Sequence, residues 1–277
     1  MSTLLLDHVV HYVNNLQDAV KVLTTHHLHA FPGGSHPGWG THNALSYFGL
    51  NYVEFLSIRD ADELAAARDS FLLSRDIQTF LPARQILHRV ALRSDDIEAS
   101  YAELQLQGLV LSPLIAGQRH DKQGNLIEWR MFTIDGDFQG VAYPFIIQWG
   151  EPDNERLALL RERGLDRPHP VGEITLQSLI FKVQQPEQVA AQWQKLFHFS
   201  LAGASTTELQ VGDRRFIFQH GEQDALIAVQ LATNNQALIN KSLFVGEGEY
   251  QFVSIGNYSP EKVQGLPAKV QGTIEEN

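Results

Sequence analysis

The chain has 277 residues, 43% of them hydrophobic, and a formal net charge of −11 at pH 7 with no basic stripe. This composition supplies enough apolar residues for a sizeable core and argues against a nucleic-acid partner. The absence of cysteine excludes disulfides, thiolate nucleophiles and cysteine-bound zinc, so a metal site would need His, Asp or Glu.

The sequence carries no pattern of a membrane or exported protein. No stretch approaches the roughly 20 apolar residues that span a bilayer. The first apolar stretch, Leu4 to Leu6, lacks a preceding basic region and is followed at once by Asp7 and His8. We therefore expect a cytoplasmic protein that has neither a nucleic acid nor a membrane as its partner.

Two segments repeat the same order of predicted elements, 81 positions apart. Each begins with a strand, at residues 6–13 and 87–93, and continues with a helix whose apolar residues are spaced three and four apart. Asn15 and Asp96 are among the candidate helix caps. About three strands of alternating pattern complete each unit.

A third, degenerate copy begins at Ile174, and Pro186 suits the first turn of its helix. Strands are predicted at 207–211, 215–219 and 226–231. We expect an α+β fold built of βαβββ modules, with these segments: a first module 1–60, a helical connector 61–84, a second module 85–152, a linker 153–172, a third module 173–234, and a C-terminal hairpin and tail 235–277.

Several motifs resemble those of the vicinal-oxygen-chelate superfamily, which includes glyoxalases, epimerases, extradiol dioxygenases and bleomycin-sequestering proteins. The motifs are Leu6–Val10, Gly33–Gly34, Trp39–Leu45, Tyr52–Leu56, Trp129–Arg130 and Pro144–Trp149. They are most similar to the glyoxalase-like branch. The resemblance implies that the first two modules pair to form a half-open curved β-sheet around a ligand cavity.

In that superfamily, the first and last strands of each module donate two ligands, and the four ligands of the two modules hold a divalent metal. The resemblance assigns these positions to His8 and Glu54 in the first module, and to Arg89 and Gln148 in the second. Arginine stays protonated and has no lone pair for a metal, so Arg89 argues against a complete four-ligand site. A divalent metal held by His8, Glu54, Gln148 and water is a further interpretation.

The leading functional hypothesis is a lyase or isomerase that moves a proton on a small anionic or carbonyl-containing metabolite. His8 and Glu54 would form the acid-base pair. Arg89 would anchor the metabolite or pair with Glu54. The alternative is a non-catalytic binding or sequestering protein of the bleomycin-resistance type, so the sequence leaves open whether the protein is an enzyme.

Further residues are predicted to contact the ligand. Trp39 and Asn43 lie in a glycine-rich loop that leads into a strand, where backbone can approach a ligand closely. Strand alternation places Arg93 on the same face as Arg89, and separates Arg130, predicted to face the cavity, from its neighbour Trp129.

The third module lacks strong metal ligands. Its residues at the equivalent positions are Ser178 and Gln230. We therefore expect this module to be structural or to form a homodimer contact.

Overall fold

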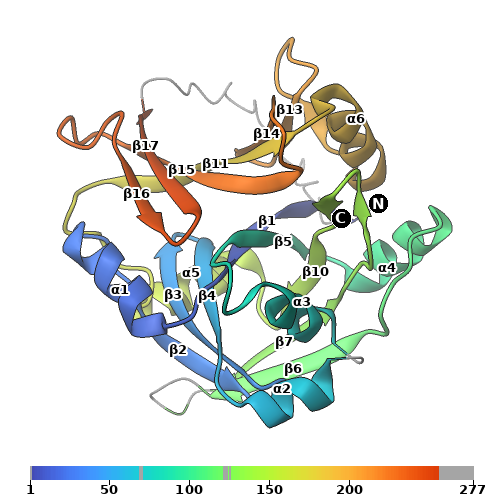
Figure 1. The fold of residues 1–277 in the computed structure, drawn as a ribbon, viewed down its shortest axis with the longest axis horizontal. Helices are drawn as coiled ribbons and strands as arrows, with labels where there is room; N and C mark the ends of the chain where they lie inside the picture. Colours follow the sequence, from blue (N-terminus) through green and yellow to red (C-terminus); the bar gives the residue numbers. More distant parts are fainter. Residues whose placement is uncertain (1, 69–70, 121–123, 125, 256–277) are drawn as a thin grey trace, which may run out of the picture.

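The computed structural model describes residues 2–68, 71–120, 124 and 126–255 (Figure 1). The first repeat consists of β1 (Leu4–Tyr12), α1 (Leu16–Thr25), β2 (Phe31–His36), β3 (Thr41–Phe48) and β4 (Asn51–Ile58). Helix α1 begins where the Asn15 side chain accepts hydrogen bonds from the backbone N–H groups of Gln17 and Asp18. It buries Leu16, Ala19 and Leu23, which are spaced three and four apart.

The second repeat has the same order with one small insertion. It consists of β5 (Leu87–Ser94), α4 (Ile97–Leu106), β6 (Ile115–His120), β7 (Leu126–Phe132) and β10 (Phe145–Trp149), with the hairpin β8 (Asp137–Phe138) and β9 (Val141–Ala142) before β10. Two helices, α2 (Ala61–Ala67) and α3 (Leu72–Phe80), connect the repeats, and α5 (Asp153–Glu162) follows them.

The two repeats form one eight-stranded curved sheet of order β2-β3-β4-β1-β5-β10-β7-β6. Strands β1 and β5 pair antiparallel at its centre, and each pairs in parallel with the last strand of its own repeat, β4 or β10. The predicted α+β architecture of paired βαβββ modules is confirmed. Among the described residues, no helix has both the length and the apolar character needed to cross a membrane.

The central strand pair confirms the offset of 81 positions between the repeats. Val9 lies opposite Val90, Leu6 opposite Leu92, and His11 opposite Leu87. A two-fold rotation about the Val9–Val90 pair therefore relates the β1 residues from Leu6 to His11 to the residues 81 positions later. The register shifts beside Asp7 and beside His88 are β-bulges related by this rotation.

A second sheet of seven strands repeats the same order, without the final edge strand. It contains β11 (Ile174–Val183), β12 (Ser200–Leu201), β13 (Glu208–Val211), β14 (Arg214–His220), β15 (Ala225–Thr233), β16 (Ser242–Val245) and β17 (Gly248–Ser254) in the order β12-β13-β14-β11-β15-β17-β16, and α6 (Pro186–Phe197) follows β11.

One prediction for this sheet is wrong. The strand predicted at 226–231 is not the third strand after α6. It belongs to β15, which pairs antiparallel with β11 as β5 does with β1. The error arose because β12 has only two residues, too few to give an alternating pattern.

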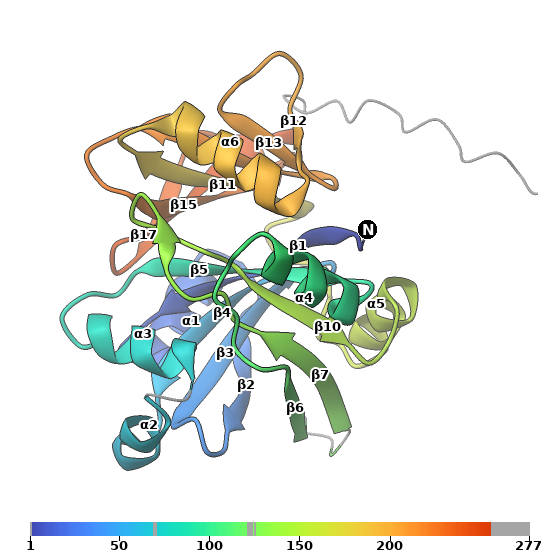
Figure 2. The same cartoon turned by 90° about the vertical axis from the view of Figure 1, so that its right-hand side faces the viewer.

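One apolar cluster joins the two sheets. It includes Val9 and Val90 of the eight-stranded sheet, Leu179 of the seven-stranded sheet, and Trp193 of α6. A separate cluster fills part of the concave face of the eight-stranded sheet, where Phe71 and Ile77 pack on strand residues. Figure 2 shows the seven-stranded sheet above the eight-stranded one and the helices α2 and α3 at the lower left. The connector helices therefore occupy part of the face on which a ligand cavity is expected.

Candidate functional site

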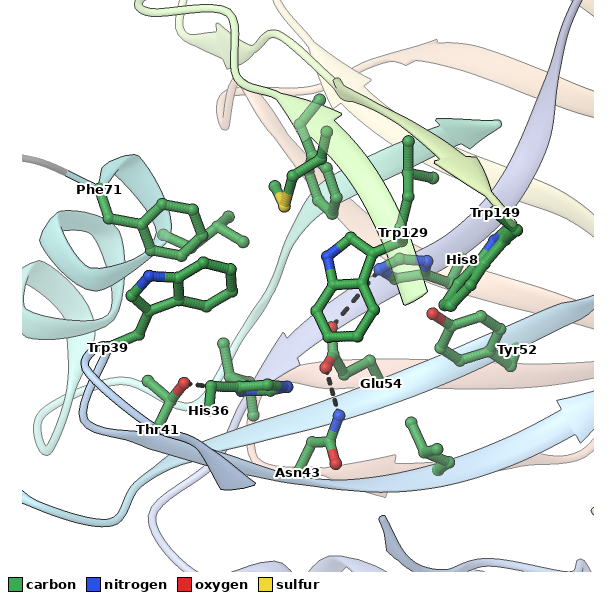
Figure 3. A pocket seen from close by; sticks show the side chains of 16 residues that line it. His8, His36, Trp39, Thr41, Asn43, Tyr52, Glu54, Phe71, Trp129 and Trp149 are labelled. Carbon is green, nitrogen blue, oxygen red and sulfur yellow. Dashed lines mark hydrogen bonds and ion pairs between the residues drawn. The ribbon is translucent and has the colours of Figure 1, made fainter. Parts of the chain in front are cut away.

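A pocket of about 60 Å³ remains on the concave face, between strands of both modules and the connector helix α3 (Figure 3). Most of its walls are aromatic or aliphatic. Of the residues predicted to contact a ligand, His8, Trp39, Asn43 and Glu54 line it. Arg89, Arg93, Arg130 and Gln148 do not belong to the described lining.

A β-bulge sets the conformation of the first functional pair. Because the bulge lies at Asp7, the carboxylate of Asp7 and the imidazole of the next residue can reach each other, which regular strand alternation would prevent. His8 Nδ1 lies 2.6 Å from Asp7 Oδ1. Both side chains are buried, and Tyr52 stacks on the imidazole with ring centroids 4.4 Å apart.

The Asp7 carboxylate is held by two further groups. Trp149 Nε1 donates to Oδ2 at 2.9 Å, and Arg156 of α5 lies 3.4 Å from the same oxygen. The guanidinium of Arg156 also stacks 4.1 Å above the Trp149 ring. Burial would raise the pKa of Asp7, but Arg156 and the hydrogen bond with His8 outweigh it and lower that pKa to about 2.

Glu54 is the carboxylate that faces the pocket. Its Oε2 lies 3.4 Å from His8 Nε2, and its Oε1 accepts a 2.6 Å hydrogen bond from Asn43 Nδ2. Burial favours the neutral acid, yet His8 and Asn43 lower the pKa of Glu54 to about 2. A buried carboxylate needs a cation or a hydrogen-bond donor, and His8 and Asn43 supply both.

His8 therefore lies between two carboxylates. Burial lowers the pKa of its imidazole, but the hydrogen bonds and charges of Asp7 and Glu54 outweigh burial and raise it. The two carboxylates therefore favour the imidazolium form of His8, which lies between Asp7 and Glu54. Its second ring nitrogen, Nε2, lies on the pocket side.

Arg89 is buried outside the pocket, against α3. Its guanidinium forms an ion pair with Asp76, and Nη1 donates to the backbone oxygen of Tyr143 at 2.7 Å. The predicted pairing of Arg89 with Glu54 is therefore wrong. The periodicity of α3 does not reveal that Asp76, a buried residue of that helix, would lie over β5.

The other predicted polar contacts also lie elsewhere. Gln148 Nε2 donates to Asp95 O at 2.9 Å, and its Oε1 accepts from the Ile97 N–H at the start of α4. Arg93 pairs with Asp153 at 2.8 Å. The side chain of Gln148 thus stabilises the start of a helix rather than facing the pocket.

Strand alternation separates Trp129 from Arg130, but in the sense opposite to the prediction. Trp129 is the one that lines the pocket. Arg130 is half exposed and pairs with Glu98 at 2.5 Å. The apolar ring of Trp129 lies on the buried face of β7, and the charged side chain of Arg130 lies on the solvent-exposed face.

The predicted equivalence of Gln148 with Glu54 is wrong by three positions. Val10 pairs with Glu54, and its two-fold counterpart Ala91 pairs with Phe145. Phe145 therefore takes the position that Glu54 has in the first module. Its ring contacts His8 edge-on, with centroids 5.4 Å apart.

This set of side chains does not fit the divalent metal that the resemblance implies. Two of the four symmetry-related positions are occupied by Arg89 and Phe145, neither of which has a lone pair to donate. Within the described parts of the chain, no group of three or more His, Asp or Glu side chains is arranged to hold a metal.

Several residues of the site were not predicted, among them Asp7, Arg156, Phe71 and His36. Asp7 carried a signal, because a carboxylate in the middle of a buried strand needs a partner. Arg156 and Phe71 carried none, since they come from a linker helix and a helical connector whose packing is not encoded in local periodicity. His36 also lines the pocket, with Nδ1 2.9 Å from Thr41 Oγ1.

Comparisons with known proteins agree with this fold. A family model described as a glyoxalase-like domain matches residues 6–197. A hypothetical protein from Staphylococcus aureus is similar in structure with a TM-score of 0.79 and 22% identity, over 92% of this chain and 100% of that chain. No curated protein matches the sequence.

Two further solved structures resemble smaller or less similar parts of the fold. A variant of 4-hydroxymandelate synthase from Streptomyces coelicolor has a TM-score of 0.53 at 10% identity, over 84% of this chain and 72% of that chain. A methylmalonyl-CoA epimerase variant from the same organism has a TM-score of 0.41 at 15% identity, over 55% of this chain and 100% of that chain.

Proposed function

Because the chain belongs to the glyoxalase-like domain family of the vicinal-oxygen-chelate superfamily, we propose that it is an enzyme that moves a proton on a small carbonyl compound without a metal. The observation that carries the proposal is the buried Asp7–His8–Glu54 array, whose last member faces an apolar pocket. Titratable groups in a pocket whose pKa values are shifted by burial and by a specific charged partner are typical of functional sites.

Glu54 is the base in this proposal. Its carboxylate takes a proton from the carbon next to the carbonyl, and the electron pair of the broken C–H bond forms an enolate. His8 Nε2–H donates a hydrogen bond to the enolate oxygen, where negative charge develops. Return of the proton to a different position gives the isomerised product.

The low pKa of Glu54 is compatible with this role. The carboxylate is held ionised mainly by its hydrogen bond with His8, at a distance of 3.4 Å. When the carbonyl oxygen of a ligand takes over that donor and the ligand displaces water, both changes raise the pKa of Glu54. Ligand entry thus converts a resting ion pair into a competent base.

The proposal is tested by following exchange of α-hydrogens for deuterium in simple ketones, including cyclohexanone and 2-indanone, by NMR in D₂O. The wild type is expected to accelerate exchange. Glu54→Gln should lose about 10²-fold or more of that rate, the usual scale for a general base, while its unfolding transition survives.

Asp153→Asn is the matched control, because it alters a carboxylate outside the pocket and should exchange like the wild type. Exchange by Glu54→Gln at the wild-type rate would contradict the assignment of the base.

A non-catalytic binding or sequestering protein is the second candidate. The aromatic walls of the pocket favour it, since Trp39, Trp129 and Trp149 are suited to binding without any chemistry. Tight binding of a ketone by the wild type with no α-hydrogen exchange would decide in favour of this candidate.

A further inference from the structure

The charges around the pocket constrain what enters it. Among the described residues of the lining, none is Lys or Arg. The nearby arginines are paired with carboxylates, including Arg89 with Asp76 and Arg156 with Asp7. Glu54 itself presents a carboxylate to the cavity, and the charge of the His8 imidazole is already matched by Asp7 and Glu54 on its two sides. A carboxylate or phosphate on the ligand would therefore meet a like charge at Glu54.

The pocket walls are flat and their positions are fixed. Trp39 stacks on Phe71 with ring centroids 4.1 Å apart and an interplanar angle of 19°. The Ser74 hydroxyl donates to the backbone oxygen of Trp39 at 3.1 Å, which ties this wall to α3. In Figure 3 the Trp39–Phe71 pair lies to the left of Glu54, and the Trp129 ring is drawn across the line that joins His8 and Glu54.

A glycine leaves room for the ring of Trp129, which forms the second wall of the pocket. Gly117 lies opposite Trp129 in the β6–β7 pair, and a Cβ on Gly117 would come within 2.2 Å of the indole. The absence of that Cβ lets the indole lie directly against β6. Both tryptophans are therefore positioned before a ligand binds, which reduces the entropy cost of binding a flat molecule between them.

Resting on the proposed function, we infer that the ligand is a neutral planar aromatic ketone whose ring lies between Trp39 and Trp129. Its carbonyl group lies toward His8 Nε2 and its acidic carbon toward Glu54. The cavity, about 60 Å³ as it stands, is smaller than the roughly 150 Å³ of a cavity that admits benzene, so it takes the ketone edge of a one-ring or two-ring ligand and the walls must move apart for the ring itself. A nucleotide or coenzyme handle is too large to enter it. Trp39 and Trp129 are thus the specificity-determining residues.

Calorimetric titration with three probes of similar size tests the inference. The probes are 2-indanone, its saturated and puckered analogue hexahydroindan-2-one, and the anion indane-2-carboxylate. Wild-type protein is expected to bind 2-indanone about tenfold more tightly than either analogue, the scale of two aromatic contacts. Trp39→Leu and Trp129→Leu should each reduce this preference severalfold.

Phe244→Leu is the control variant, because Phe244 is an exposed aromatic residue of β16, 58% accessible, and lies outside the pocket lining. It should keep the wild-type preference. Equal or tighter binding of the saturated ketone or the anion, or no binding of 2-indanone by folded wild-type protein, would overturn the inference.

The outcome is separable from the test of proton transfer. Selective binding of 2-indanone without α-hydrogen exchange would refute the proposed catalysis and keep the ligand class. Exchange in both ketones, with no difference in affinity between them, would refute the ligand class and keep the catalysis.

Discussion

His8 and its two carboxylates form a compact electrostatic unit at the scale of single residues. Asp7 binds one ring nitrogen at 2.6 Å and Glu54 faces the other at 3.4 Å. The shorter contact is made by the carboxylate that faces away from the ligand, so Asp7 determines how the imidazole is oriented and protonated. Arg156 in turn keeps Asp7 ionised. Within this unit Asp7 therefore positions the imidazole, and Glu54 faces the ligand.

Removing the positioning carboxylate should be visible without any substrate. In Asp7→Asn the pKa of His8 is expected to fall, because the variant loses the largest of the contributions that raise it. NMR titration of the His8 imidazole measures this change. Asp153→Asn, which removes a carboxylate from Arg93, serves as the comparison and should leave the titration of His8 unaltered.

The same groups predict how stability depends on pH. Asp7 and Glu54 have folded-state pKa values of about 2, below their ordinary values of 3.8 and 4.5. They stabilise the fold above those ordinary values, and this contribution is lost as the pH falls toward 2. The raised pKa of His8 acts in the opposite sense, stabilising the fold below pH 6.5 and losing effect as the pH rises through the folded value.

Urea unfolding measured between pH 2 and 6 tests this prediction. The wild type is expected to lose stability steeply below pH 4.5, and Glu54→Gln should show a shallower loss over the same range. A variant with the same slope as the wild type would show that Glu54 is not held ionised by its neighbours.

At the scale of elements, helix α3 decides what the second module contributes. Its Asp76 forms a buried ion pair with Arg89, and its Leu73 and the preceding Phe71 line the pocket. The helix thus neutralises the cation on β5 and leaves the reactive groups on the strands of the first module. The two modules are alike in topology and unlike in chemistry.

Breaking the ion pair should be costly. Arg89→Met leaves the Asp76 carboxylate buried without its cation, which is expected to lower the free energy of unfolding by about 3–5 kcal/mol. The double variant Arg89→Met with Asp76→Leu should recover most of that loss, because neither charge then remains. Urea unfolding of the wild type, the two single variants Arg89→Met and Asp76→Leu, and the double variant tests this. Losses of the single variants that add up in the double variant would contradict it.

The elements show what the sequence can and cannot predict about this site. The repeat and its 81-residue offset follow from strand and helix patterns, which is why His8 and Arg89 were recognised as equivalent. The last strands were misaligned because Phe145–Trp149 is uniformly apolar up to Gln148 and gives no parity by which to register it. The Asp76 partner was not predicted because contacts between a connector helix and a sheet depend on tertiary packing alone.

At the scale of the whole molecule, the second sheet repeats the strand order of the first but carries different side chains. Ser178 takes the position of His8, and its hydroxyl donates to Gln230 Oε1 at 2.6 Å. Gln230 in turn donates to Gln251, which takes the position of Phe145. These amide and hydroxyl groups satisfy one another, so we propose a structural role for this sheet.

The two sheets are joined by a buried polar contact as well as by apolar packing. His11 Nδ1 lies 2.7 Å from the Tyr250 hydroxyl, and burial lowers the pKa of His11 to about 3, so the ring is neutral. Tyr250→Phe leaves that nitrogen without its partner and is expected to lower the free energy of unfolding by about 1–3 kcal/mol. Chemical denaturation measures the loss, and Phe244→Leu should show almost none.

The distribution of tryptophan in the molecule has a practical consequence. Of the four in the chain, Trp39, Trp129 and Trp149 line the pocket. Trp193 belongs to α6 and is fully buried against the second sheet. Intrinsic fluorescence is therefore a built-in reporter of pocket occupancy, with the Trp193 emission as an internal baseline. A compound library can be screened on the unlabelled protein, and compounds that change the fluorescence identify ligands of the pocket without an activity assay.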